Sequence, residues 1–171
     1  RGLAEAGHQV HLLAYAHAGF ERDEPFTIHR VPDWPSFSSE RSGLDWRKPL
    51  LDARLAATCR RLIRELNPDV VHAHHYEALV AAVAADPLSQ TPRVFHLHAL
   101  FEPELETYLP ERWARGARLV GAITDRLLPR LATRVAAVDS SIERLLVDRG
   151  MNERRVCYVP PPAQVPPLPQ R

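Results

Sequence analysis

PDVVHAHH, residues 68–75, is a short apolar run that turns polar at its carboxyl end. RVFHLH, residues 93–98, repeats this pattern, and a helix-like segment follows each of the two runs. Such runs predict strands over 69–74 and 93–97. In an open parallel sheet, ligands bind just beyond the carboxyl ends of the strands. The histidines at the ends of these two strands are therefore candidates for a binding site.

Strands and helices alternate along the rest of the chain. Apolar residues from Leu51 to Leu66 follow helical spacing, with arginines on the opposite face, and Asn67 and Pro68 end this helix. The same reasoning predicts four more strands, at 9–15, 27–31, 134–138 and 156–159. It predicts further helices at 1–6, at 76–86, from Pro103, at 110–132 and at 140–150. This alternation predicts the α/β class, with a doubly wound, mostly parallel Rossmann-like sheet.

Two local signals refine the helices of the second half. Pro129 lies within the segment 110–132 and should kink or divide it, because proline has no backbone N–H to donate. Ser140 and Glu143 have the spacing of a capping box. Asp139 precedes them and is also interpreted as a cap, because its carboxylate would repel an anion at this helix N-terminus.

The composition is that of an ordinary globular protein, with 45% hydrophobic and 25% charged residues among 171. The net charge of +1 gives no support for nucleic-acid binding. Cys59 and Cys157 suggest neither a disulfide framework nor a zinc site, so we expect a reducing compartment. No apolar stretch approaches the ~20 residues that a membrane-spanning helix needs. These observations together predict a cytoplasmic protein.

The chain is expected to form one domain over 1–159, followed by a proline-rich tail over 160–171. Six of the twelve tail residues are proline, which favours an extended chain over regular structure. A long loop over 32–48 carries three aromatic residues, Trp34, Phe37 and Trp46. These side chains would either stack on a sugar or lipid or pack on the domain surface.

Three segments together resemble the N-terminal half of glycosyltransferase family 4. The family typically carries PDVVHAH, then a strand that ends in T-x-H, then A-x-x-V-I-A-V-S. This chain has PDVVHAHH, the strand ending at His98, and RVAAV at 134–138, while RGLAEAGHQVHLL at 1–13 resembles the first helix and second strand of the family. The resemblance covers most of the chain. It implies the acceptor-binding domain of a retaining, two-domain GT-B enzyme that moves a sugar from a nucleotide-diphosphate donor to a hydroxyl acceptor.

The chain departs from the family pattern at both ends. The family's first strand and Gly-rich loop are missing before Arg1, and Pro160 to Gln164 replace the family's P-N-G-V-D. The second domain, which binds the nucleotide sugar through basic residues and an E-x7-E motif, is also missing. We therefore expect a domain truncated at both ends, part of a longer chain and inactive alone. The alternatives are a non-catalytic binding module that has lost the donor domain, or a flavodoxin-like or epimerase-like domain with the same topology.

The candidate site residues lie at the two strand ends. His98 can donate a hydrogen bond to a sugar hydroxyl, and the resemblance implies that it is catalytic and faces the cleft between the two domains. His74 and His75 are expected to bind the acceptor, and Glu102 to contact substrate hydroxyls. The alternatives are contacts of the histidines with neighbouring loops and a solvated Glu102 at a helix start. His72 lies within its strand and is expected to be a core residue.

We expect no metal ion and no cofactor. Zinc prefers three or four His, Cys or carboxylate ligands, and the spacing of His72, His74, His96 and His98 matches no zinc motif. The expected partners are a sugar or lipid-linked acceptor and a nucleotide-sugar donor bound by the missing domain. Basic and aromatic residues share one helix, at Arg112, Trp113, Arg115 and Arg118. They form either a solvated face or a weak contact with the inner membrane face, since a patch without a second anchor binds weakly.

Overall fold

The computed structural model describes residues 1–16, 24–31 and 48–160. The contacts divide the chain into two compact units, 1–93 and 94–171, which are described separately. Trp34, Phe37 and Trp46 and the tail from 161 onward lie outside the described residues, so the expectations for them stay predictions. The predicted domain boundary at residue 159 also stays a prediction.

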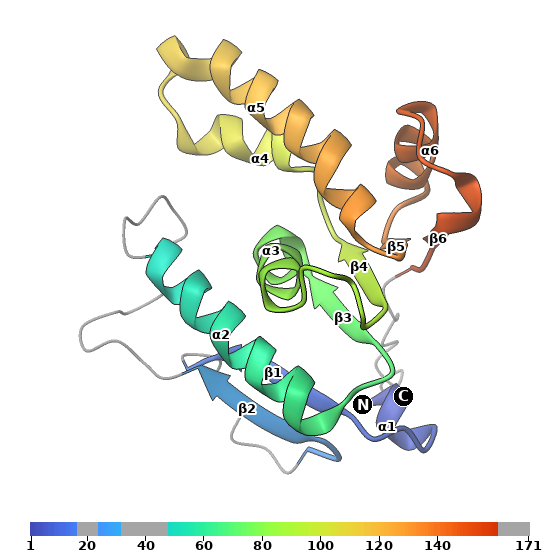
Figure 1. Cartoon of the computed structure of the whole chain (residues 1–171). Helices are drawn as coiled ribbons and strands as arrows, with labels where there is room; N and C mark the ends of the chain where they lie inside the picture. Colours follow the sequence, from blue (N-terminus) through green and yellow to red (C-terminus); the bar gives the residue numbers. More distant parts are fainter. Residues whose placement is uncertain (17–23, 32–47, 161–171) are drawn as a thin grey trace, which may run out of the picture. The chain divides into compact units, whose positions relative to one another are not determined.

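Within its described residues, the unit 1–93 contains three strands and three helices, which Figure 1 shows in blue to green. In chain order these are α1 (Gly2–Glu5), β1 (His11–Tyr15), β2 (Thr27–Val31), α2 (Lys48–Leu66), β3 (Val71–His74) and α3 (His75–Ala85). β1 and β2 form a parallel pair, in register from His11 beside Thr27 to Tyr15 beside Val31. Asn67 ends α2 with a left-handed backbone (φ 45°), and its N–H donates to Ile63 O at 3.0 Å.

The core of this unit joins β1 and β2 to the two longer helices, α2 and α3. Val31 of β2, Leu55 of α2 and Ala81 of α3 are buried together, and Leu13 and Tyr15 of β1 pack against them. α2 contacts β1, β2 and α3 along its buried side. Burying these apolar side chains fixes where α2 and α3 begin relative to the carboxyl end of β1.

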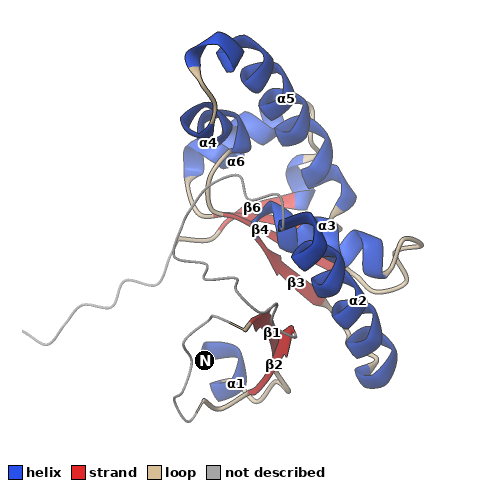
Figure 2. Ribbon diagram, turned by 90° about the vertical axis from the view of Figure 1, so that its left-hand side faces the viewer, coloured by secondary structure: helices blue, strands red, loops and turns tan. Residues whose placement is uncertain are grey.

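The unit 94–171 holds the remaining elements. β4 (Arg93–Leu97) leads into it, followed by α4 (Phe101–Tyr108), η1 (Glu111–Trp113), α5 (Ala114–Leu127), η2 (Leu128–Leu131), β5 (Arg134–Ala137), α6 (Ser140–Asp148), η3 (Glu153–Arg155) and β6 (Val156–Tyr158). β4 pairs parallel with β5, and β5 with β6. Figure 2 shows these strands in red and the helices α4, α5 and α6 of this unit in blue, and α6 contacts β5 and β6. The buried residues of the unit 94–171 include Phe95, Leu97, Val135, Ala137, Ile142 and Leu146.

Among the described residues, β1 pairs parallel with β2 in the unit 1–93, and β4, β5 and β6 pair parallel in that order in the unit 94–171. The α/β class with parallel strands and intervening helices is confirmed. The strands predicted at 27–31 and 93–97 have the predicted bounds, while the strand predicted from residue 9 begins at His11. Pro129 divides the segment 110–132 as predicted, because α5 ends at Leu127 and a 3-10 turn containing Pro129 follows.

The predicted capping box at Ser140 is wrong, whereas the cap at Asp139 is confirmed. Asp139 is the N-cap of α6, and its Oδ1 accepts the N–H of Ser141 at 2.6 Å. Ser140 is already the first residue of the helix. Asp139 has an extended backbone, which lets its short side chain reach the free N–H groups of the first turn. The Ser141 hydrogen bond is the main cause that lowers the pKa of Asp139.

Among the described residues, none of the helices combines the length and the apolar character that crossing a membrane requires.

Candidate functional site

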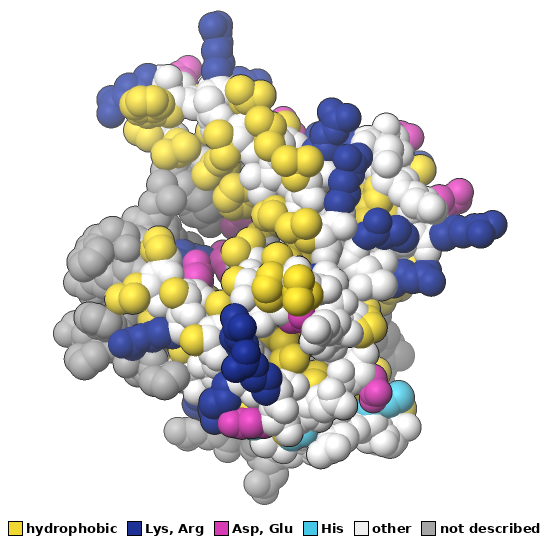
Figure 3. Space-filling model, in the orientation of Figure 1, with side chains coloured by type: hydrophobic (Ala, Val, Ile, Leu, Met, Phe, Trp, Pro, Cys, Tyr) yellow, Lys and Arg dark blue, Asp and Glu magenta, His cyan; other side chains and the backbone are white. Residues whose placement is uncertain are grey.

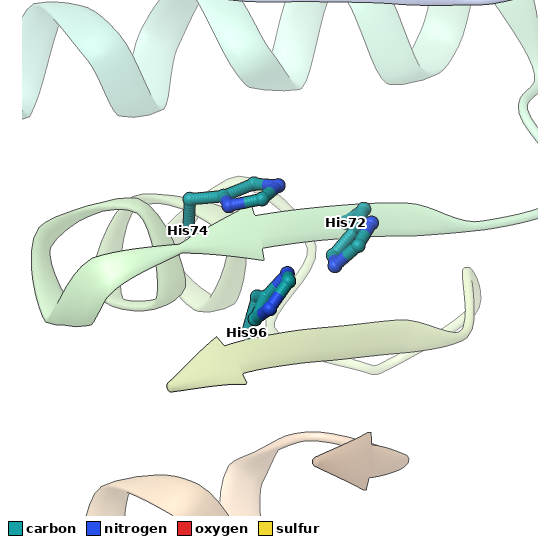
Figure 4. Close-up of side chains that lie close together, drawn as sticks. All are labelled: His72, His74 and His96. Atoms are coloured by element: carbon teal, nitrogen blue, oxygen red, sulfur yellow. The ribbon is translucent and has the colours of Figure 1, made fainter. Parts of the chain in front are cut away.

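His72 and His74 are two residues apart on β3, and both project from the same face of this strand (Figure 4). Their ring centroids lie 4.6 Å apart, both side chains are exposed, and Ala73 between them is buried. The prediction that His72 is a core residue is therefore wrong. Successive side chains of a strand point to opposite faces, and here the small Ala73 takes the buried face. His74, predicted to bind substrate, is the last residue of β3.

His75 follows directly and opens α3 with a left-handed backbone. Its φ of 66° is unusual for a residue with a side chain, because the Cβ atom then crowds the following carbonyl oxygen. The exposed His75 side chain is thus held at the carboxyl end of β3 at a cost in backbone energy. Strain of this kind is concentrated at functional sites.

Glycine in place of His75 should relieve this strain. We expect His75→Gly to raise the free energy of unfolding by up to about 1 kcal/mol, because glycine adopts positive φ without a Cβ clash. His74→Gly is the matched control. His74 is extended at φ −99°, so glycine there should lower the free energy of unfolding by about 0.5–1 kcal/mol. Urea unfolding of both variants measures the difference in the free energy of unfolding. Equal destabilisation by both would contradict backbone strain at His75.

A polar network lies at the carboxyl end of β1, within the unit 1–93. The hydroxyl of Tyr15, the last residue of β1, donates to Asp52 Oδ1 at 2.5 Å. Lys48 donates to Glu77 Oε1 at 2.6 Å and lies 4.0 Å from Asp52 Oδ2. Lys48 and Asp52 belong to the first two turns of α2, and Glu77 to the first turn of α3. We call these four residues the β1-end network.

The β1-end network shifts the acidity of two of its members. Burial would raise the pKa of Glu77, but the hydrogen bonds from Lys48 and from its own backbone N–H outweigh burial and lower it. The charge of Lys48, and then the nearby His75, lower it further. Burial first, and then the bond to Asp52, raise the pKa of Tyr15, so Tyr15 remains a neutral hydrogen-bond donor. The network thus holds two carboxylates against one ammonium group.

The sequence reasoning missed the β1-end network. Lys48 and Asp52 are four residues apart on a helix, a spacing that marks a pair but not a site. Tyr15 and Asp52 are 37 residues apart, and Lys48 and Glu77 are 29 apart. Only the packing of α2 against β1 and α3 brings these side chains together.

His98 follows the buried end of β4. Leu97, the last residue of β4, is fully buried (0% exposed), whereas His98 is exposed. The rings of His96 and His98 are stacked, with centroids 4.6 Å apart and an interplanar angle of 20°. His98 therefore lies where the sequence predicts, just beyond the carboxyl end of its strand. The expectations that it is catalytic and that the histidines hold no metal ion stay predictions.

Glu102 lies in the first turn of α4, close to the end of α6. Its Oε2 accepts from Arg149 Nη2 at 3.2 Å, and both side chains are about three-quarters buried. The sequence predicts Glu102 as a substrate contact, and that role stays a prediction. Beside it, Asp125 of α5 accepts hydrogen bonds from the backbone N–H groups of Phe101 and Glu102.

The basic and aromatic residues of the segment 112–118 are exposed, and the choice between a solvated face and a membrane contact stays a prediction. Further along α5 four large apolar side chains are also exposed, at Leu119, Val120, Ile123 and Leu127. Figure 3 shows hydrophobic side chains beside Lys and Arg in the region of α5. This surface mixes positive charge with apolar area.

Three solved structures match this chain over more than half of its length. A UDP complex of Staphylococcus aureus MnaA matches with a TM-score of 0.51 and 14% identity over 88% of this chain and 43% of that one. Anabaena HepE with UDP-glucose has a TM-score of 0.46 and 18% identity over 80% of this chain and 30% of that one. A structure described as a UDP-N-acetylglucosamine 2-epimerase from Listeria monocytogenes has a TM-score of 0.45 and 16% identity over 63% of this chain and 26% of that one.

The likeness to MnaA supports the α/β class. The chain spans less than half the length of each of these three proteins. No curated protein matches its sequence significantly. The family model of glycosyltransferase family 4, by contrast, matches residues 1–164, nearly the whole chain. The resemblance seen in the sequence is therefore confirmed, and this chain belongs to glycosyltransferase family 4.

Proposed function

We propose that this chain is the N-terminal, acceptor-binding domain of a glycosyltransferase. The reaction moves a sugar from a nucleotide-diphosphate donor to a hydroxyl group of a sugar or lipid-linked acceptor. The observation that carries the proposal is the exposed imidazole of His98 directly beyond the buried end of β4, in a chain of this family. Substrates of open parallel sheets bind at this end of the strands.

His98 is the residue to which we assign the catalytic contact. Its imidazole donates a hydrogen bond to a hydroxyl of the reacting sugar, or pairs with a phosphate oxygen when protonated. Stacking on His96 restricts the ring, which lowers the entropy lost when substrate binds. The departing diphosphate is stabilised by positive charge and dipoles supplied mainly by a second domain, with retention at the sugar carbon.

The acceptor is assigned to the strand ends of the unit 1–93. His74 and His75 lie at the end of β3, and the β1-end network lies at the end of β1. Carboxylates accept hydrogen bonds from sugar hydroxyls, and Asp52 and Glu77 bring two carboxylates to this strand end. With two carboxylates and one ammonium group, the network suits neutral hydroxyls better than a phosphate.

The surface of α5 supports a further part of the proposal. Its exposed arginines and apolar side chains have the composition of a helix that lies on an anionic membrane. A lipid-linked acceptor would be reached from such a position, on the cytoplasmic face. The contact is weak by itself, because a single patch without a second anchor gives reversible binding.

Turnover assays of the purified chain and of the complete protein that carries it test this function. With a panel of nucleotide sugars and acceptors, we expect sugar transfer by the complete protein and none by residues 1–171 alone. Positioning and charge stabilisation together lower the activation barrier by roughly 10 kcal/mol or more. One domain alone forms only half of the cleft, so it loses most of this barrier lowering. Turnover by the isolated chain at ordinary enzyme rates would refute the prediction that residues 1–171 are inactive alone. A complete protein that binds sugars without turnover would favour a non-catalytic binding module.

A further inference from the structure

Asp125 is a carboxylate in the interior of the unit 94–171 that the proposed chemistry does not use. It lies on α5, and none of its surface is exposed (0%). A buried carboxylate is costly unless hydrogen bonds replace the water that it has lost. Asp125 receives two such bonds, to Oδ1 from Phe101 N–H at 2.8 Å and to Oδ2 from Glu102 N–H at 3.0 Å. Arg149 Nη1 lies 4.0 Å from Oδ2.

These bonds cap α4 from another helix. The N-cap of α4 is Leu100, whose apolar side chain makes no capping bond. The first N–H groups of a helix have no partner within the helix, and they carry partial positive charge. Asp125, 24 residues away along the chain, supplies the negative charge and both acceptors. The start of α4 is therefore fixed by α5 and not by its own sequence.

The close approach of α4 depends on Gly121, one turn before Asp125 on α5. A Cβ atom at Gly121 would lie only 2.4 Å from the Cα atom of Glu102. Residues four apart lie on the same face of a helix. Gly121 thus leaves the space that the start of α4 occupies, and Asp125 binds the N–H groups that arrive there.

The residues between β4 and α4 are held at both ends. Leu97 pairs with Ala137 of β5, and its carbonyl accepts from Val138 N–H at 3.2 Å. Phe101 is held by Asp125. Only residues 98–100 span these two anchors, and His98 is the first of them. We propose that Asp125 is a positioning residue for His98, a role that rests on the function proposed above.

The first test measures the position of His98 without any activity. In residues 1–171, Asp125→Asn keeps the shape of the side chain but turns one acceptor into an NH2 group that faces a backbone N–H. We expect faster amide hydrogen exchange at residues 99–102 and shifted ring NMR signals of His98, with Val138 unchanged. Asp148→Asn, which removes an exposed carboxylate from α6, is the matched control. Unchanged His98 signals in a folded Asp125→Asn would overturn the proposal.

The second test uses sugar transfer by the complete protein. A small misplacement of a catalytic group can cost about 100-fold in rate, so we expect Asp125→Asn to lower kcat about 10- to 100-fold with little change in KM. In the His98→Ala background the same change should have almost no further effect, because two residues that act through one contact are not additive. Additive losses would mean that Asp125 acts only through stability, and they would overturn the proposal.

A third variant keeps the proposal falsifiable if Asp125→Asn does not fold. Leu100→Gly loosens the residues between the anchors and leaves Asp125 in place, so it should shift the His98 signals and lower kcat in the same way. Full activity of Leu100→Gly would overturn the proposal. The two proposals can fail separately. If His98→Ala keeps full activity, the proposed function fails, while the NMR measurement still decides whether Asp125 positions His98.

Discussion

Alanine at Gly121 should destabilise the protein strongly, by about 2–4 kcal/mol in the free energy of unfolding. Its Cβ atom would lie 2.4 Å from the Cα atom of Glu102, a separation that real Cβ contacts essentially never show. The atom that it meets is backbone and not the end of a flexible side chain, so α4 itself has to move away from α5. That movement also lengthens the two bonds from Phe101 and Glu102 to Asp125. A buried carboxylate that loses its partners adds to the loss.

Gly116 provides the control on the same helix. It lies in α5, and a Cβ atom there would meet nothing within 4 Å. Gly116→Ala should therefore raise the free energy of unfolding by about 0.5–1 kcal/mol, the ordinary gain of alanine over glycine in a helix. Urea melts of the two variants beside the unchanged chain give the comparison. If Gly121→Ala is as stable as Gly116→Ala, α4 and α5 do not approach each other as described.

The largest expected effect on activity is that of His98→Ala. In the complete protein we expect kcat/KM to fall about 30- to 1000-fold, which corresponds to roughly 2–4 kcal/mol of lost transition-state stabilisation. The free energy of unfolding should fall by at most about 1 kcal/mol, because His98 is exposed and fills no core position. Turnover measurements beside a urea melt separate the two effects.

Two other histidines serve as controls for His98. His8 is exposed and lies before β1, away from the strand ends, so His8→Ala should retain both activity and stability. His72 is exposed on β3, so His72→Ala should leave the free energy of unfolding nearly unchanged. The assignment of His98 fails if all three variants show the same kcat/KM. A large loss of stability in His72→Ala would contradict its exposed position.

The sequence alone determines the order of strands and helices and the strand ends that carry the histidines. Strand 93–97 and the end of α2 at Asn67 are local features, set by apolar runs, by a proline and by a residue that tolerates positive φ. His74 and His98 follow from them, because a polar residue after an apolar run marks the end of a buried strand. The family resemblance rests on the same local segments.

Tertiary structure alone decides which side chains meet. Asp125 binds N–H groups 23 and 24 residues away, and Tyr15 reaches Asp52 across 37 residues, so no local pattern marks these contacts. The face of β3 that is buried also depends on packing, and it places Ala73 inside and His72 outside. Local spacing fixes the backbone through short-range sterics and hydrogen bonds. The partner of a charged or capping side chain is set by how the helices pack, which brings together residues that are distant in the sequence.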